Sequence, residues 1–203
     1  MKKLVYLICT FLLLGGCTEL LDEKPSTDLV IPDNLEDLRG LLDNDSQIIG
    51  KTGGLHVFSS DDLYLRESGF QNVQELLLGA YQFDFDMVEQ FRNGDWESHY
   101  QQIFYCNVVL DELNKIEPRE NERNEYNDIM GSAYFLRAYN YFHLATQFVL
   151  HPDLPEAING LGLPLKKEAN VNIQPRRSSI EETYNLIMED LNEARSLLVN
   201  TPF

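Results

Sequence analysis

The chain has 203 residues, of which 33 are acidic and 16 are basic, so its formal net charge at pH 7 is -17. Hydrophobic residues make up 43% of the chain and charged residues 24%, a balance that is typical of one globular domain with a buried core. Because binding to a phosphate backbone needs clustered lysine and arginine, this charge argues against nucleic acid as a partner. Anionic lipid surfaces are disfavoured for the same reason.

The first 16 residues have the pattern of a secretory signal peptide. Lys2 and Lys3 precede an apolar run over residues 4–14, which is too short to span a membrane and has the length of a signal-peptide core. The run ends in Leu14-Gly15-Gly16-Cys17, which looks like a bacterial lipobox. We therefore expect cleavage before Cys17 and attachment of acyl chains, palmitate among them, to this cysteine. The alternative is an ordinary signal peptide with an incidental cysteine.

Cleavage at this position would leave a mature chain of 187 residues with 33 acidic and 14 basic side chains, a net charge of -19. Cys9 would leave with the signal peptide and Cys17 would carry lipid, so Cys106 would be the remaining cysteine. No internal disulfide is then possible in the mature chain. Cys106 lies in an apolar helical pattern, which favours a small buried side chain over a nucleophile.

The mature chain begins with a predicted tether over residues 17–33, which holds two prolines, several acids and little periodicity. A domain over residues 34–203 follows. Asn34 is placed to cap a short helix with an apolar stripe of leucines at 35, 38, 41 and 42. Glycines and paired serines and aspartates interrupt residues 44–95, so we expect this section to be rich in loops with some short helices.

Three long helices are predicted after Asp95, because apolar residues recur there every three or four positions. The first runs to about Ile116, and the second covers residues 123–149. The third is capped by Ser179, with Glu182 completing a capping box, and ends near residue 200. Prolines and glycines over 151–164 predict turns. No alternation of period two is sustained after Asp95, so the fold class is all-α, with helical hairpins after a loop-rich N-terminal section.

Four stretches of the sequence are similar, in the same order, to motifs of one known family. They are Cys17-Thr18-Glu19-Leu20-Leu21-Asp22 with Pro25; residues 96–113 with Tyr100, Ile103 and Cys106-Asn107; Gly131-Ser132-Ala133-Tyr134-Phe135-Leu136-Arg137-Ala138-Tyr139-Asn140-Tyr141-Phe142; and Arg177-Ser178-Ser179 followed by Glu182, Tyr184, Ile187, Asp190-Leu191 and Ala194. The third stretch looks like the family's GEARFLRAYYYF segment, with Ser132 in place of the usual glutamate. Together they resemble the SusD/RagB-like outer-membrane nutrient-binding lipoproteins.

The resemblance implies tetratricopeptide-like helical hairpins and a non-catalytic lipoprotein without a cofactor. Family members sit on the outer surface of the Gram-negative outer membrane, over a SusC-like TonB-dependent transporter, and capture glycans or, in some cases, peptides for nutrient import. Cys17 would supply the link to outer-membrane lipid. The resemblance reaches only the N-terminal part of the family, whose members are usually more than twice as long. We therefore expect an incomplete SusD-like domain that is marginally stable and by itself binds ligand weakly, with a fragment that has no binding activity of its own as the alternative.

Ligand residues do not follow from a family motif, so they are predicted from the chemistry of sugar recognition. That chemistry uses aromatic faces and planar polar groups in a preformed concavity. The candidates are Asp61, Asp62, Tyr64 and Trp96, with Tyr81, Phe83, Asp84 and Phe85 as further members of the loop-rich section. The alternative is that the aromatic rings, Trp96 included, fill the core while the acids face water.

Arg137 lies in the middle of the second long helix. We interpret it as a structural charge that pairs with an acid on the neighbouring helix, such as Asp111 or Glu112.

Other functions have weaker support. Asp61-Asp62 and Asp84-x-Asp86 are the residues from which a glycosidase acid pair would be built, but such pairs are common among 33 acids. The histidines, at 56, 99, 143 and 151, lack metal-ligand spacing, and Lys51-Thr52-Gly53-Gly54 lacks the first glycine of a phosphate loop. No metal or cofactor is expected. A helical-repeat module that binds peptide or protein remains the main alternative.

Overall fold

The computed structural model of the chain describes residues 32–44, 55–84, 86 and 94–198. The predicted signal peptide, Cys17 and nearly all of the tether lie outside the described residues, as do Phe85 and residues 199–203. The described helices are α2 (Leu35–Leu42), α3 (Leu55–Phe58), α4 (Glu67–Phe70), α5 (Glu75–Gln82), α7 (Gly94–Leu113), α8 (Arg123–Phe148), the 3-10 helix η3 (Pro155–Asn159) and α9 (Ile180–Leu197); the strands are β1 (Leu161–Pro164) and β2 (Arg177–Ser179).

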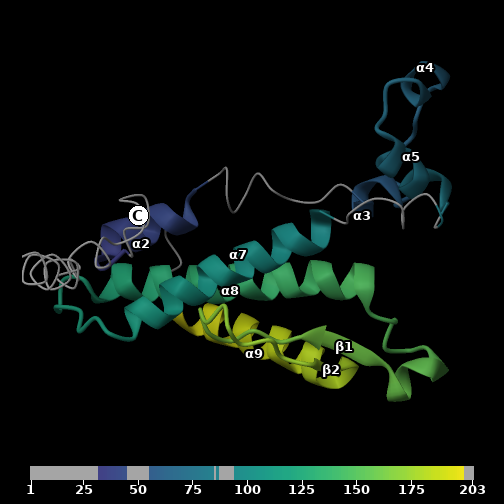
Figure 1. Cartoon of the computed structure of the whole chain (residues 1–203). Coiled ribbons are helices and arrows are strands. Elements are labelled where there is room, and N and C mark those ends of the chain that lie inside the picture. Colours follow the sequence, from purple (N-terminus) through teal and green to yellow (C-terminus); the bar gives the residue numbers. More distant parts are fainter. Residues whose placement is uncertain (1–31, 45–54, 85, 87–93, 199–203) are drawn as a thin grey trace, which may run out of the picture. The chain divides into compact units, whose positions relative to one another are not determined.

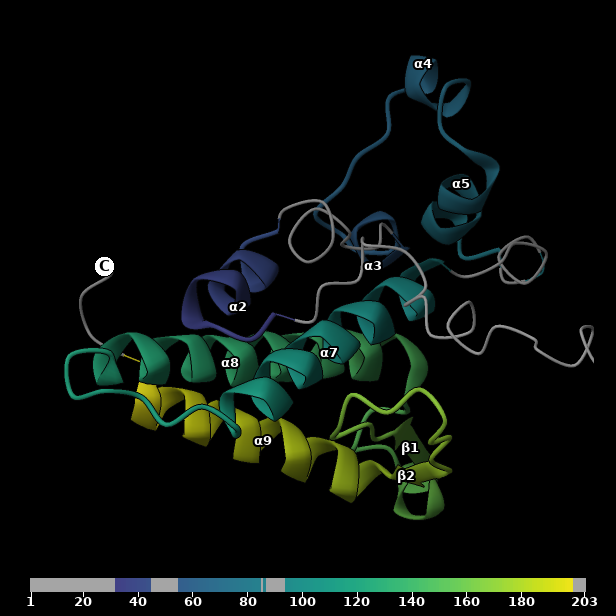
Figure 2. The ribbon, with the colours of Figure 1, turned by 60° about the vertical axis from the view of Figure 1, so that its left-hand side comes forward.

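The helices α7, α8 and α9 confirm the three long helices that the sequence predicts, with ends within three residues of the expected positions. Helix α8 packs against both α7 and α9, and it runs antiparallel to each of them in Figures 1 and 2. The predicted capping box starts α9, because Glu182 N donates to Ser179 Oγ at 3.0 Å and Ser179 N donates to Glu182 at 2.7 Å. The fold is all-α and built from tetratricopeptide-like helical hairpins.

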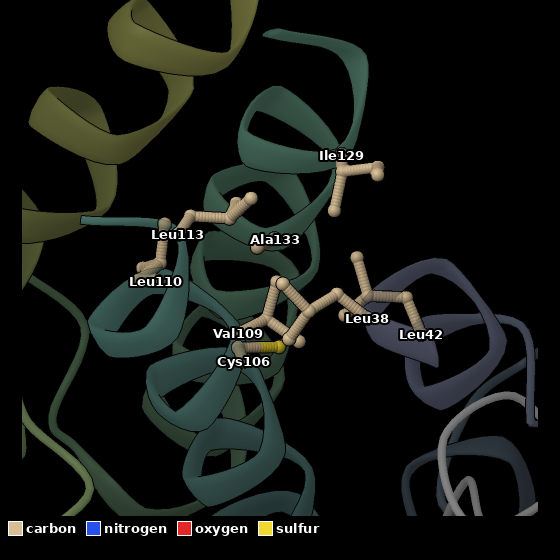
Figure 3. Packing of buried hydrophobic residues seen from close by; sticks show 8 residues of the cluster. All are labelled: Leu38, Leu42, Cys106, Val109, Leu110, Leu113, Ile129 and Ala133. Atoms are coloured by element: carbon tan, nitrogen blue, oxygen red, sulfur yellow. The ribbon is translucent and has the colours of Figure 1, made fainter. Parts of the chain in front are cut away.

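The first core cluster joins α2, α7 and α8 (Figure 3). Its buried members are Leu38, Leu42, Cys106, Val109, Leu110, Leu113, Ile129 and Ala133. The prediction for Cys106 is confirmed: the thiol is completely buried, and this burial raises its pKa to about 12, so it remains protonated at neutral pH. Asn34 caps α2 as expected, accepting from the backbone N–H of Asp37 at 2.9 Å.

The second core cluster joins α7, α8, α9 and strand β1. Its buried members are Ile103, Ala138, Tyr141, Leu144, Ala145, Leu163, Leu186 and Ile187. Since α8 contributes to both clusters, its hydrophobic residues face two directions, which explains why its sequence shows a broad apolar surface rather than one narrow stripe.

The predicted partner of Arg137 is wrong. The guanidinium group makes a bidentate ion pair with Asp190 of α9, with Nε–Oδ2 and Nη2–Oδ1 distances of 2.8 and 2.7 Å. A third bond, of 2.8 Å, runs from Nη1 to Oδ1 of Asn107 on α7. The reason is that α8 lies between two helices, and the acid comes from the one that follows later in the chain.

The two acids expected to pair with Arg137 have other roles. Asp111 accepts a hydrogen bond from the backbone N–H of Ala169 at 2.8 Å, and Glu112 pairs with Lys115 at 2.7 Å. Burial alone would lower the pKa of Arg137, but its hydrogen bond and charge interaction with Asp190 outweigh that effect and raise the pKa. The structural interpretation of Arg137 is therefore kept, with Asp190 as the partner.

A short antiparallel sheet of β1 and β2 is an element that the sequence did not predict. Leu161 is opposite Ser179 and Pro164 is opposite Arg177, with an irregular register between them. Strands of three and four residues are too short to show an alternating pattern. Gly162 is needed here, because a Cβ at this position would clash with the carbonyl of Ser179 and the hydroxyl of Thr183.

Residues 55–84 confirm the loop-rich prediction. Helices α3 and α4 are four residues long, and α5 is eight residues long. Helix α5 ends at Phe83, whose φ of 56° lies in the left-handed region that glycine usually occupies. Among all the helices of the described residues, none is both long and apolar enough to cross a membrane.

Candidate functional site

Three of the predicted ligand residues lie together on the loop between α3 and α4. Asp61, Asp62 and Tyr64 are exposed, and the Tyr64 side chain is 80% accessible to solvent. None of the three residues lines either of the two cavities described below. The loop thus offers an aromatic ring and two carboxylates on an exposed surface.

Trp96 is held among other aromatic rings at the start of α7. Its ring centroid lies 4.9 Å from that of Tyr100 and 5.1 Å from that of Phe148, and the side chain packs on the second core cluster. The ring is half-buried rather than fully exposed. Its neighbours come from α7 and α8, not from the loop that carries Tyr64, and this placement agrees with the core-packing alternative.

The remaining candidates of the loop-rich section are scattered. Tyr81 is half-buried and meets Phe70 edge to face at 5.7 Å, while Phe83 is exposed. Asp84 and Asp86 are exposed and follow α5, on a different segment from Asp61 and Asp62. No glycosidase acid pair is formed from these residues within a described cavity.

Two of the histidines lie at the contact between α7 and α8. His99 is buried, its Nδ1 lies 2.7 Å from Oδ1 of Asn140, and its ring stacks on that of His143 at 5.6 Å. Across the described ranges, no group of three or more His, Cys, Asp or Glu side chains is placed to hold a metal ion. His99 and His143 are better explained as part of the packing between α7 and α8.

Two open cavities lie beside the N-terminal half of α9, where no site was predicted. The first, here called the apolar cavity, has a volume of about 590 Å³ and is lined by Pro152, Leu154, Pro155, Ala157, Ile158, Gly160, Ser179, Ile180, Glu181, Tyr184 and Asn185. Most of these side chains are apolar, and they come from the segment around η3 and the first turns of α9. Tyr184 provides an aromatic ring, while Glu181 and Asn185 provide planar polar groups.

The second, here called the cationic cavity, has a volume of about 540 Å³. It is lined by Leu165, Lys167, Arg176, Arg177, Ser178, Glu182, Asn185, Leu186 and Glu189. Asn185 lines both cavities, so one amide lies at the boundary between an apolar space and a charged one. Each volume is within the range of small-molecule sites.

A strap of chain, residues 164–169, contributes Leu165 and Lys167 to the cationic cavity. It is fixed by side chains of α7 and α8, of which Asn107 and Tyr141 are buried and Tyr100 is half-buried. The Tyr100 hydroxyl donates to the Pro164 carbonyl at 2.9 Å, and the Asn107 amide donates to the carbonyls of Lys166 and Glu168 at 3.0 and 3.3 Å. The Tyr141 hydroxyl donates to the Lys166 carbonyl at 3.0 Å and accepts from the Lys166 N–H at 2.6 Å.

Burial keeps these hydroxyl groups protonated. It raises the pKa of Tyr100 and of Tyr141 well above the ordinary value for tyrosine, so both phenols remain hydrogen-bond donors at any physiological pH. The far end of the strap is fixed by Asp111, which accepts from Ala169 N–H. The backbone beside the cationic cavity is thus positioned before any ligand arrives.

One signal in the sequence points to this place. Four of the 16 basic residues lie between positions 166 and 177, although the chain has twice as many acids as bases. Charge clustering of this kind is visible without a structure. What the sequence does not show is that α9 and the strap bring three of these four residues to one cavity.

The family follows from a comparison of the chain with known proteins. Residues 19–203 match the model of the SusD-like_3 family, whose description is "Starch-binding associating with outer membrane". The match covers most of the sequence, so the chain belongs to this SusD-like family. None of the curated proteins matches the chain significantly.

Solved structures share its fold. A candidate sugar-binding protein from Bacteroides vulgatus ATCC 8482 superposes with a TM-score of 0.65 at 21% sequence identity, covering 86% of this chain and 39% of its own. A SusD superfamily protein from Bacteroides thetaiotaomicron VPI-5482 gives a TM-score of 0.63 at 16% identity, covering 82% of this chain and 38% of its own. The chain therefore spans about two fifths of the length of these two proteins.

Proposed function

We propose that this chain acts in a non-catalytic cell-surface lipoprotein that binds glycans and passes them to a SusC-like TonB-dependent transporter for import. The observation that carries the proposal is the family match over residues 19–203. The lipobox around Cys17 supports a lipid anchor in the outer membrane, facing outward. The acidic composition supports a partner other than nucleic acid.

The apolar cavity is the place we propose for a sugar ring. Tyr184 offers the aromatic face that stacks on the apolar side of a pyranose, and Asn185 and Glu181 offer planar groups for its hydroxyls. Asp61, Asp62, Tyr64 and Trp96 form a second proposed set of ligand residues. Of these, Tyr64 is the most exposed ring and the easiest to test.

Affinity electrophoresis in gels that contain neutral polysaccharides tests this function. We expect starch or a related glucan to retard the wild-type chain. Asn185→Ala and Tyr184→Leu should abolish the retardation, while Tyr139→Ala, which removes a half-exposed ring of α8 outside the cavity, should preserve it. Retardation that survives both cavity variants but is lost in Tyr64→Ala would move the site to the loop. Absence of binding to every polysaccharide would refute the proposed function.

The transporter and the lipid anchor need separate experiments. A SusC-like transporter should copurify with the wild-type chain from solubilised outer membranes, and no copurification would contradict that part of the proposal. Labelled palmitate should be incorporated into the wild-type protein and not into Cys17→Ala. Absence of catalysis is checked by reducing-sugar release: release that disappears in Asp61→Asn or Asp84→Asn would favour a glycosidase instead.

One observation favours peptide or protein binding as a second function. Helix α8 exposes three aromatic rings, Phe135, Tyr139 and Phe142, between 38% and 47% accessible. From residue 129 to the end of α8 at 148, Arg137 is the sole charged side chain, and it is buried. Aromatic residues without charges are typical of the centre of a protein interface. Retention of peptides without retention of polysaccharide would support this function.

A further inference from the structure

The cationic cavity is unusual for a chain of this composition. Lys167, Arg176 and Arg177 line it, in a protein with 33 acidic and 16 basic residues. The side chains of Lys167 and Arg176 are exposed, and neither forms an ion pair with any residue that the structure describes. The positive charges of these two side chains are therefore not taken up in an ion pair among the described residues.

The Arg177 side chain is held in place by uncharged groups. Its guanidinium group donates to three backbone carbonyls, those of Gly162, Leu161 and Phe148, at 2.7, 3.1 and 3.2 Å. These acceptors are uncharged, so they fix the group beside the cavity while its positive charge remains uncompensated. Arg177 is both a support for strand β1 and a fixed source of positive potential.

Two carboxylates also line the cavity, and they are not equivalent. Glu182 accepts a hydrogen bond from the backbone N–H of Ser179 at 2.7 Å, so its charge is engaged at the N-terminus of α9. Glu189 is exposed and lies two turns further along the helix. The lining therefore holds three basic and two acidic side chains, and one of the two acids is already engaged at the helix N-terminus.

The positions of the basic groups are prepared in advance. Lys167 lies between Lys166 and Glu168, and the backbone of both neighbours is fixed by hydrogen bonds from Asn107 and Tyr141. Arg176 immediately precedes strand β2, which is paired with β1. A site with a prepared backbone loses less conformational entropy when it binds a ligand.

We infer that the cationic cavity binds the anionic group of an acidic glycan, a uronate carboxylate or a sulfate ester, while a neighbouring sugar occupies the apolar cavity. Asn185 borders both spaces, so one ligand would contact both through adjacent sugar residues. Arginine suits such a group because its planar fork donates two hydrogen bonds to one oxyanion. This inference rests on the proposed glycan-binding function and adds the chemical class of the glycan.

The test measures binding of the full chain to three oligosaccharides of equal length by calorimetry: an oligogalacturonate, a sulfated galactan fragment and a neutral malto-oligosaccharide. We expect one of the two acidic ligands to bind about tenfold or more tightly than the neutral one at low salt, and this preference to shrink as salt is raised. Whichever acidic ligand binds more tightly identifies the anionic group as carboxylate or sulfate.

Matched variants assign the effect to the cavity. Lys167→Gln and Arg176→Gln should remove the preference for the acidic ligand and leave the affinity for the neutral one unchanged. Arg195→Gln, which neutralises an exposed arginine in the last turn of α9 outside the cavity, should change neither. Melting temperatures equal to the wild type confirm that the variants are folded.

The outcomes separate the inference from the function on which it rests. Equal affinity for acidic and neutral ligands, or an acidic preference that survives Lys167→Gln and Arg176→Gln, would overturn the inference and leave glycan binding in place. Absence of binding to all three oligosaccharides and to the polysaccharide panel would overturn both.

Discussion

Helices α7 to α9 and helices α3 to α5 are both rich in leucine and aromatic residues, yet they use them differently. In the long helices these residues fill two clusters, and polar side chains such as Arg137 and Asn107 are buried with their partners. In the short helices α4 buries no residue and α5 buries Gly79 and Ala80 alone. We therefore expect the long helices to be the more stable region, because helix length and contacts between distant segments, more than apolar content, set local stability.

The largest expected effect is on the buried ion pair. Arg137→Ala leaves Asp190 without its bidentate partner inside the protein, so we expect the free energy of unfolding to fall by about 3–5 kcal/mol. Urea denaturation measures this loss. Arg66→Ala, at an exposed arginine before α4, is the control and should change stability by about 0.5 kcal/mol or less. Equal small effects at both positions would remove the distinction between the two regions.

A cavity in the second core cluster should cost nearly as much. Leu144 is completely buried between the long helices, and Leu144→Ala is expected to lower the free energy of unfolding by about 2–5 kcal/mol. Leu63→Ala removes the same atoms from a half-buried leucine of the loop-rich region and should cost less than about 1 kcal/mol. If Leu63→Ala cost as much as Leu144→Ala, the region around α4 would have a core of its own.

Tyr141→Phe tests the attachment of the strap. The substitution removes the hydroxyl that bonds to both the N–H and the carbonyl of Lys166. The Lys166 N–H then has no acceptor at this position, and we expect the free energy of unfolding to fall by about 1–3 kcal/mol. The matched variant Tyr81→Phe removes one long hydrogen bond, of 3.4 Å, from the Leu65 N–H and should cost less.

The same variant has a predicted pH signature. Burial raises the pKa of Tyr141 in the folded protein above the unfolded value of 10.0, so the folded state favours the neutral phenol. The corresponding stability is complete below about pH 10 and is lost as the pH rises above it. Tyr141→Phe should therefore show a weaker alkaline loss than the wild type. An identical alkaline limb in the two proteins would show that Tyr141 does not contribute to it.

Helix caps should give smaller changes, of opposite sign in the two regions. Ser179→Ala removes the cap of α9 and should cost about 1 kcal/mol in unfolding free energy. Helix α5 begins at Gln74 without a side-chain cap, so Gln74→Ser should instead stabilise that helix, by about 0.5 kcal/mol. Hydrogen exchange of the α5 amides measures the second effect locally. No gain in protection would mean that α5 is limited by packing rather than by its cap.

Acid pH provides the smallest expected effect. The hydrogen bonds from Ser179 hold the pKa of Glu182 below its ordinary value, and the side chain is fully exposed. A carboxylate whose pKa is lowered by folding stabilises the folded state at pH values above its ordinary pKa. This stabilisation is lost as the pH falls through the pKa that the group has in the folded state. Glu182→Gln should flatten the acid limb of stability slightly at pH values below the ordinary pKa of 4.5. An unchanged acid limb would show that the capping box is not a measurable part of it.

The fold was largely predictable from the sequence, because its signals are local. The caps Asn34 and Ser179 and the period of the apolar residues located α2 and the three long helices. The partner of Arg137 was not predictable, because Asp190 is 53 positions away and the sequence does not say which of two flanking helices supplies the acid. The sheet was missed because its strands are too short to show alternation.

The candidate site was less predictable than the fold. Asp61, Asp62 and Tyr64 were found by residue type, and the structure places them on an exposed loop between α3 and α4. The apolar cavity combines residues from Pro152 to Asn185, which are 33 positions apart, and the cationic cavity combines residues from Leu165 to Glu189, which are 24 positions apart. Residue chemistry can be read along a sequence, but concavity arises only where distant segments meet.

The sequence by itself determined the charge, the helical periodicity, the caps of α2 and α9 and the family, since each of these depends on residue types at short spacing. The tertiary structure alone decided that Arg137 meets Asp190, that tyrosines of α7 and α8 fix the strap, and that three basic side chains line one cavity. The physical reason is the same in each case. Burial and hydrogen bonding act between atoms that are close in space, and residues far apart in the chain are brought together only by packing of the helices.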